Sequence, residues 1–390
     1  MFQFLRGSSL DSATPDFAQH HNPFIRHIVR RTREFLENEI DPETGERYLK
    51  PVKVDLYGES DRDAVQLPPY LKDAYEVAEE FCELLGQRIK GSGFLKTLLL
   101  RRVGSTICAG MNTAKNMLGA WEDIEEEDDE ATPEEKPKSL TPSERDLLEQ
   151  FLDRLEANQE DDPKYEVVRR LLVEEGWLNE GCIIFSQYFD SIRWLADQLS
   201  RDLPKGEVIA IYAGGQKSGT LTDGVFVKKE RESLKKSVRD GEIRLLLGTD
   251  AASEGLNLQR LGTLINLDLP WNPTRLEQRK GRIQRIGQLR DVVRIYNMRY
   301  KGSVEDRVHD LLSDRLEAIH QLFGQIPDVL EDVWVQVALG KIEEAKQTIN
   351  AVPQKHPFEF KYHQVKKVPW ESCATVLSAS DRRQHLLQGW

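Results

Sequence analysis

Between residues 182 and 296, short apolar runs alternate with stretches of helical periodicity. The apolar runs are 182–185, 208–212, 243–247, 264–267 and 292–296. The stretches with the pattern of amphipathic helices are 190–200, 226–239 and 273–284. Strands that alternate with helices are joined by right-handed crossovers and form a parallel sheet, and strands that are apolar throughout fit burial on both faces. The predicted fold class is therefore α/β, a parallel sheet flanked by helices.

The segments on either side of this region have mainly helical patterns. Further helices are expected at 24–38, 68–85, 94–118, 143–157, 163–175 and 328–349. Thr141 followed by Pro142 indicates a helix start, because a capping residue precedes proline at the first helical position. Ser303 and Asp306 form a capping pair that predicts another start.

The acidic residues are concentrated in one segment. Residues 122–135 contain ten carboxylates and no basic residue. Like charges at this density repel, so we expect 121–140 to be an acidic, disordered linker, either a flexible tether or a regulatory mimic of DNA. This divides the chain into a mostly helical segment at 1–120, a sheet-containing lobe at 141–302 and a helical extension at 303–390.

The composition excludes several classes of protein. No apolar run approaches the roughly 18 residues of a membrane helix, and the first residues lack the basic and apolar pattern of a secretory signal. The four cysteines are far apart and include no C-x-x-C pair, which argues against a zinc knuckle or a disulfide scaffold. We therefore expect a cytoplasmic protein with no membrane partner, and we assign no metal ligands.

A polar loop follows the third apolar run. Residues 248–258 have the sequence Gly-Thr-Asp-Ala-Ala-Ser-Glu-Gly-Leu-Asn-Leu. In parallel sheets, ligands bind outside the carboxyl ends of the strands. Small residues let the backbone approach a phosphate, and hydroxyl and amide groups can hydrogen-bond it. Taken alone, this composition is a weak signal, because loops like it are commonly plain turns rather than phosphate sites.

A basic helix follows the fourth apolar run. Gln278, Arg282 and Arg285 are spaced four and three residues apart, which places them on one helix face. Two guanidinium groups on one face can bind the charge of a triphosphate. Residues 272–301 contain nine basic and two acidic residues in a chain whose net charge is −12. This local excess favours an anion site over a solvated helix face.

The loop and the helix together resemble motifs V and VI of superfamily-2 helicases. Residues 269–273 (Leu-Pro-Trp-Asn-Pro) and 285–288 (Arg-Ile-Gly-Gln) resemble the Swi/Snf family of DNA-translocating ATPases, and its bacterial RNA-polymerase-recycling branch in particular. Residues 183–187 resemble the motif IV strand of that family, and 212–215 its aromatic-to-glycine turn. The close resemblance covers about 180–300 and implies a RecA-like lobe, the second of two. Within the helical segment at 1–120, residues 24–36 and 94–118 resemble more loosely the stretch that joins the two lobes in that family.

The resemblance also implies roles for residues of the helix. Arg285 matches the arginine finger of the family. Arg282 matches a second arginine that contacts phosphate, and Gln278 matches the motif VI glutamine that faces the nucleotide. These three residues are the candidate catalytic group.

Three residues of the loop match motif V. Gly255 and Asn257 match positions that touch or sense the nucleotide, and Thr249 matches a position that contacts the DNA backbone. The implied ligands are ATP with Mg²⁺, and the implied partner is double-stranded DNA.

The other half of such an ATPase site has no match in this sequence. A first lobe supplies a phosphate loop, G-x-x-x-x-G-K-[ST], and a magnesium-binding Asp-Glu pair. In residues 91–97 the lysine follows leucine rather than glycine, and Asp129-Glu130 follows an acidic run rather than an apolar strand. We interpret the chain as a fragment or a split subunit, inactive alone, with ATP and Mg²⁺ bound mainly by a first lobe in the same or a companion chain.

Two classes of function stay open from the sequence. The first is the second lobe of an ATP-dependent double-stranded-DNA translocase. The second is a non-catalytic nucleic-acid-binding or scaffold module derived from that lobe.

Overall fold

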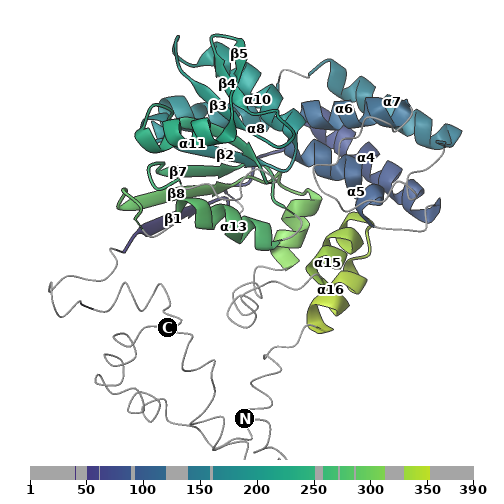
Figure 1. Ribbon diagram of the computed structural model, residues 1–390. Helices are drawn as coiled ribbons and strands as arrows, with labels where there is room; N and C mark the ends of the chain where they lie inside the picture. The colour runs from purple at the N-terminus through teal and green to yellow at the C-terminus, as the bar shows by residue number, and fades with distance from the viewer. Residues whose placement is uncertain are drawn as a thin grey trace, which may run out of the picture. The chain divides into compact units, whose positions relative to one another are not determined.

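A computed structural model of the chain describes residues 40, 51–60, 62–88, 93–119, 139–158, 161–250, 258–270, 273–284, 287–311 and 329–351. Residues 52–354 form one compact unit, and the elements below belong to it (Figure 1). The expected helix at 24–38 lies outside the described residues, as does nearly all of the acidic segment.

The described strands form a single sheet. They are β1 (Lys53–Tyr57), β2 (Cys182–Ser186), β3 (Ile209–Tyr212), β4 (Gly219–Thr222), β5 (Val225–Lys228), β6 (Leu245–Thr249), β7 (Thr263–Asn266) and β8 (Val292–Asn297). Their order in the sheet is β1-β8-β7-β2-β6-β3-β4-β5. In this order, the six strands β1, β8, β7, β2, β6 and β3 are all parallel to their neighbours. β4 and β5 continue the sheet as an antiparallel hairpin. The predicted α/β class with a parallel sheet is confirmed.

Helices cover both faces of this sheet. Alternate residues of each strand point to opposite faces, so each strand contributes side chains to both cores. Ile184 of β2 belongs to the core cluster that includes Leu195 of α10 (Phe189–Asp202). Ile183 and Phe185 belong to the cluster on the other face, with Leu234 of α11 (Arg231–Asp240) and Ile283 of α13 (Pro273–Ile283). Burial on both faces explains why these strands are apolar throughout.

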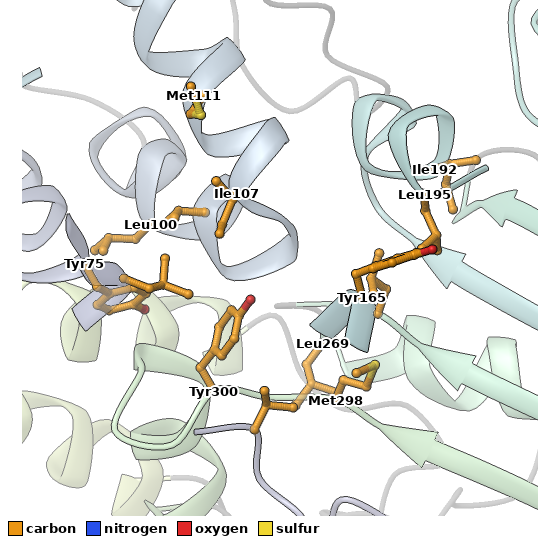
Figure 2. Packing of buried hydrophobic residues seen from close by; sticks show 14 of the residues in the cluster. Tyr75, Leu100, Ile107, Met111, Tyr165, Ile192, Leu195, Leu269, Met298 and Tyr300 are labelled. Atoms are coloured by element: carbon orange, nitrogen blue, oxygen red, sulfur yellow. The ribbon is translucent and has the colours of Figure 1, made fainter. Parts of the chain in front are cut away.

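A second layer consists of helices from the segment between β1 and β2. It contains α4 (Pro69–Arg88), α5 (Gly93–Ser105), α6 (Ile107–Leu118) and α7 (Pro142–Glu156). These helices pack on one another, and α6 also packs against α10. The short α8 (Pro163–Arg169), η3 (Arg170–Glu174) and α9 (Trp177–Glu180) lead into β2. Figure 2 shows Tyr75, Leu100 and Ile107 of this layer beside Tyr300, in one core cluster.

Side-chain caps set two of these helix starts. Thr141 Oγ1 accepts a hydrogen bond from the Glu144 amide at 3.2 Å, and Glu144 Oε2 accepts one from the Thr141 amide at 2.7 Å. This capping box confirms the predicted start of α7. The single helix expected at 94–118 is two helices, because Thr106 is extended and its Oγ1 caps α6 by accepting from the Ala109 amide.

Of two helices predicted after the last strand, the start of the first is confirmed, and the second is divided in two. Ser303 Oγ accepts from the Asp306 amide at 3.2 Å, which confirms the capping pair before the helical residues 304–311. The helix expected at 328–349 is instead a pair, α15 (Val329–Ala338) and α16 (Ile342–Ala351). The chain turns between them at Gly340, which has a φ of 72°.

One predicted helix begins too early. The helical spacing predicts a helix at 226–239, whereas residues 225–228 form β5 and α11 starts at Arg231. β4 and β5 are joined by Asp223 and Gly224, whose φ angles of 48° and 79° are typical of a two-residue hairpin turn. None of the helices within the described ranges has both the length and the apolar character needed to cross a membrane.

Candidate nucleotide and nucleic-acid site

Three central strands bring polar residues to the edge of the sheet at which the parallel strands end, here called the carboxyl edge. Ser186, at the end of β2, is in register with Thr249, at the end of β6. On the other side, Phe185 of β2 is in register with Asn266, the last residue of β7. The loop of motif V and the residues that follow β7 therefore start at the same edge of the sheet, on either side of β2.

The side chain of Arg279, from α13, lies at the centre of this edge. It is 1% exposed. Its Nε and Nη2 donate to the two carboxylate oxygens of Asp250 at 2.5 and 2.7 Å. Its Nη1 donates to Asn266 Oδ1 at 3.1 Å and to the carbonyl oxygen of Asp268 at 2.9 Å. A single buried guanidinium thus joins the motif VI helix to the residues that follow β6 and β7.

The charge of this arginine is balanced by two carboxylates. Burial alone lowers the pKa of Arg279, but the charges and hydrogen bonds of Asp250 and Asp268 outweigh burial and raise the pKa above its ordinary value. The guanidinium also lies over the ring of Phe185, with its Cζ 5.6 Å from the ring centroid. Arg279 is therefore a permanently charged structural residue, and its side chain is not free to bind a ligand.

Asp268 extends the network toward the helical layer. Its Oδ2 accepts from Ser105 Oγ at 2.7 Å and also from Ser186 Oγ, and its Oδ1 accepts from the Gln187 amide at 3.0 Å. Ser105 is the last residue of α5, so this helix is bonded to the ends of β2 and β7. Part of the stretch that resembles the connection between lobes is thereby fixed to the residues around motifs V and VI.

A buried lysine makes a second connection between the same elements. Lys164 of α8 donates from Nζ to the carbonyl oxygens of Gly104 and Leu267, each at 2.6 Å. It also lies over the Tyr300 ring at 4.8 Å. Both connections reach the C-terminal end of α5, so this helix end and the carboxyl edge form one hydrogen-bonded assembly.

Thr249 is fully buried at the end of β6. Its Oγ1 has no hydrogen-bond partner in the described part of the chain. A buried hydroxyl without a partner lowers the free energy of unfolding by about 1–3 kcal/mol. The hydroxyl of Thr249 therefore does not stabilise the fold, which favours a role in function. In this arrangement the hydroxyl does not face solvent.

The two described candidates on α13 have different surroundings. Gln278 is exposed to solvent. Arg282 is half-buried, and its Nε is a buried donor without a partner among the described residues. Arg285, Gly255 and Asn257 lie outside the described residues. The structure therefore places three of the six candidates, and it does not test how all six meet.

Sequence reasoning did not assign a role to Arg279, Asp250 or Asp268. All three lie within the segments that carry the family resemblance. The signals in the sequence were an aspartate close behind each of two buried strand ends and an arginine next to Gln278. A buried arginine requires a carboxylate partner, and the strand-end aspartates were the nearest ones.

The same contacts limit where a magnesium ion could bind. In the described ranges, no three side chains from His, Cys, Asp and Glu are grouped as metal ligands. The two carboxylates at the carboxyl edge, Asp250 and Asp268, are already bonded to Arg279. These residues do not fit a magnesium site. The Arg282 guanidinium does fit a phosphate, because its Nε lacks a partner among the described residues.

Comparison with known proteins shows which proteins this part of the molecule is similar to. Residues 163–287 match the family described as helicase conserved C-terminal domain. The chain is 32% identical over 205 residues to an uncharacterized ATP-dependent helicase, YqhH, of Bacillus subtilis, covering 52% of this chain and 33% of that protein. It is 33% identical over 177 residues to the RNA polymerase-associated protein RapA of Haemophilus influenzae, covering 39% and 19%.

A vertebrate protein matches a shorter stretch. The Fanconi anemia group M protein of Gallus gallus is 36% identical over 111 residues, which cover 28% of this chain and 5% of that protein. The chain thus spans a third or less of the length of these curated relatives.

Proposed function

Because this chain contains the C-terminal lobe of a superfamily-2 helicase-like protein, we propose that it is the second lobe of an ATP-dependent, Swi/Snf-type translocase on double-stranded DNA. Its first lobe, with the phosphate loop, belongs to the same or a companion chain. We place the motor in the cytoplasm. The lobe supplies an arginine finger and contacts to the DNA backbone, and the 390 residues alone hydrolyse no ATP.

The observation that carries this proposal is a pair of unpartnered polar groups, one in each of two joined segments. Thr249 Oγ1 and Arg282 Nε are both buried, and neither is hydrogen-bonded in the described part of the protein. They come from motifs V and VI, which Arg279 and Asp250 join. Two polar groups that cost stability, on elements fixed to each other, are what a site completed by a ligand requires.

The nucleotide roles follow from chemistry and position. Bound ATP supplies the phosphoryl group that is transferred to water. Arg282 binds phosphate through its guanidinium, and Arg285 stabilises the charge of the transition state. Gln278 faces the nucleotide from the same helix face, and Gly255 and Asn257 contact it from the loop. Mg²⁺ is held by the first lobe.

Binding of DNA to Thr249 needs a rearrangement. The residue is buried, so its hydroxyl reaches a phosphate only after the end of β6 becomes exposed. A translocase moves over any sequence, so its contacts are with phosphates rather than base edges. We therefore expect binding without sequence preference and with a steep dependence on salt.

The experiment compares ATP hydrolysis by the purified chain with hydrolysis by the chain joined to a polypeptide that carries a phosphate-loop lobe. Hydrolysis stimulated by duplex DNA should occur only in the joined form and should be lost with Arg285→Ala. If the chain alone turns over ATP, the assignment as one half of a site is wrong. If the joined form binds duplex DNA but never hydrolyses ATP, the non-catalytic binding module is the better description.

A further inference from the structure

We propose that the β4–β5 hairpin and the start of α11 form a second contact surface for the phosphates of duplex DNA. This surface, here called the hairpin surface, consists of Lys217, Lys228, Lys229 and Arg231. The inference rests on the proposed function and adds residues that its motifs do not include.

Strand pairing places the hairpin surface at the carboxyl edge. β5 is antiparallel to β4, so Lys228 pairs with Gly219 at the start of β4. Gly219 pairs with Ile211 near the end of β3, and Tyr212 of β3 pairs with Gly248 of β6. Lys228 and Lys229 are therefore on the same edge as Thr249, displaced sideways across β3 and β4. The turn of the hairpin, at Asp223 and Gly224, is at the opposite edge.

The connection from β3 to β4 is held by its own hydrogen bonds. Ser218 Oγ donates to the Ala213 carbonyl oxygen at 2.8 Å, and the Ala213 amide donates back to Ser218 Oγ at 3.1 Å. The Lys217 amide donates to the Gly214 carbonyl oxygen at 3.0 Å. Gln216, with a φ of 62°, accepts from Lys228 Nζ at 2.7 Å through Oε1. Lys217 thus belongs to a turn fixed by hydrogen bonds, and the side chain of Lys228 is bonded to the same turn.

The contacts of Lys228 and Arg231 are with neutral groups. Lys228 is bonded to a side-chain amide, and the Arg231 Nε donates to the Ala213 carbonyl oxygen at 3.2 Å. Lys228, Lys229 and Arg231 are exposed. Glu230 and Glu232 flank Arg231 in sequence, and the Glu232 carboxylate is bonded to Lys235 at 2.7 Å. This excess of cations makes the hairpin surface of a net-acidic chain attractive to a polyanion.

The aromatic residues near this surface favour a duplex over a single strand. Lys217 Nζ lies 4.7 Å from the centroid of Phe189, and Arg231 Cζ lies 5.7 Å from that of Tyr212. Arg193 covers Phe226 in the same way at 5.0 Å. These rings are covered by cations of the protein. Single strands are usually bound by bases stacked on aromatic faces, whereas covered rings and projecting lysines offer contacts to phosphates only.

The test uses the full 390-residue chain and a fluorescently labelled DNA duplex of mixed sequence, with affinity measured across a salt series. The double variant Lys228→Ala/Lys229→Ala removes two exposed charges from the carboxyl edge. The control Lys205→Ala/Arg239→Ala removes two exposed charges that precede β3 and β6, at the opposite edge. Both variants change the net charge equally and remove no buried side chain.

If Lys228 and Lys229 bind phosphates, the slope of log affinity against log salt should become shallower by about 0.9 for each lost contact. The loss of affinity should be largest at low salt, and the control should stay close to the unmodified chain. Equal slopes for the two variants, with duplex binding retained, would overturn the hairpin surface and leave the proposed function intact.

Two further results concern the identity of the ligand. If the unmodified chain does not bind the duplex, both the proposed function and this inference are wrong. If poly-glutamate competes as well as duplex DNA of the same charge concentration, the surface recognises acidic polypeptide, and the assignment to nucleic acid is wrong. Weak competition by poly-glutamate supports DNA as the ligand.

Discussion

The guanidinium of Arg279 binds the carboxylate of Asp250 through two parallel hydrogen bonds, at 2.5 and 2.7 Å. Asp250 directly follows Thr249, and Arg279 lies between Gln278 and Lys280 on α13. The two segments that carry the family resemblance are therefore joined by a buried ion pair before any ligand binds. Paired geometry of this kind fixes the relative position of the two elements.

Replacing Arg279 should destabilise the lobe strongly. Arg279→Ala leaves Asp250 and Asp268 buried without their cation, and breaking a buried pair in this way costs about 3–5 kcal/mol. We expect denaturant unfolding to report a loss of this size. Arg239→Ala, at an exposed position on α11, is the matched control and should stay within about 0.5 kcal/mol. A loss for Arg279→Ala no larger than that of the control would mean that the ion pair does not hold the edge together.

Removing the hydroxyl of Thr249 should have opposite effects on stability and on DNA affinity. Thr249→Val keeps the shape and removes a buried hydroxyl that has no partner among the described residues. Its unfolding free energy should therefore be unchanged or higher, by up to about 1–3 kcal/mol. Affinity for duplex DNA should fall if the hydroxyl binds phosphate. A variant that is less stable would indicate a structural hydrogen bond, and one with unchanged affinity would remove Thr249 from the DNA contact.

The parallel strands were predictable because burial on both faces makes them apolar throughout. The hairpin was missed although it has a strong local signal. Asp223-Gly224 is a preferred two-residue turn, and the flanking Leu221 and Val225 belong to short β-prone runs. The charged residues that follow have helical spacing, which extended the predicted helix backward into β5.

β1 was not predicted, although its residues carry a strand pattern. Apolar Val54 and Leu56 alternate with charged Lys53 and Asp55. The strand exists because β8 offers a free edge, with which it pairs in parallel from Lys53↔Val292 to Tyr57↔Tyr296. That partner is more than 230 residues away in sequence, from Lys53 to Val292, so the local pattern could not show which strand β1 pairs with.

The sequence groups the candidate residues by helix face, but it does not show which neighbouring residue is turned toward the protein. Helical spacing groups Gln278, Arg282 and Arg285, but it cannot tell which neighbouring arginine is buried. The structure shows that Arg279 is, because its guanidinium meets Asp250 and Asp268. The roles of all six candidates stay predictions: Thr249, Gly255, Asn257, Gln278, Arg282 and Arg285.

Glu305 should make the stability of the lobe depend on pH. The residue is 4% exposed, its Oε2 has no partner within the described structure, and a Cβ at Gly104 would lie 3.0 Å from its Oε1. Burial raises the pKa of Glu305 to about 7; the charge of Lys164 opposes this rise and that of Asp268 adds to it. The folded pKa is thus above the ordinary value of 4.5. The contribution of Glu305 is then fully present below the unfolded pKa and is lost as the pH rises through about 7.

The difference in unfolding free energy between the unmodified chain and Glu305→Gln should reveal this contribution. From about pH 5 to pH 8, the unmodified chain should lose roughly 2–3 kcal/mol relative to the variant. The control is Glu149→Gln, at an exposed position on α7, which should leave the pH dependence unchanged. Parallel curves for Glu305→Gln and the unmodified chain would show that Glu305 does not titrate in this range.

Arg285 should act on the rate rather than on nucleotide binding. In the joined motor, Arg285→Ala should lower kcat by about 10³–10⁵-fold, because an arginine finger stabilises the transition state. Nucleotide affinity should change little. Lys280→Ala is the control on the same helix and should matter less, because helical spacing turns Lys280 away from the face of Arg285. A loss of affinity as large as the loss of rate would assign Arg285 to ground-state binding.

The acidic segment should weaken DNA binding by the chain that carries it. Its ten carboxylates within 122–135 are tethered to the lobe, and a tether gives them a high effective concentration at any basic surface. Deleting 121–135 should therefore tighten duplex binding, most clearly at low salt, where charges are least screened.

A second variant separates competition from a general effect of charge. Replacing the ten carboxylates by their amides keeps the length of the segment and removes its charge. If the segment competes with DNA for the cations of the hairpin surface, both changes should tighten binding, and the gain should shrink when Lys228→Ala/Lys229→Ala is also present. If it only lowers the net charge of the chain, the gain should be small and the same with or without those lysines. Equal affinities for all forms at every salt concentration would exclude the segment from DNA binding.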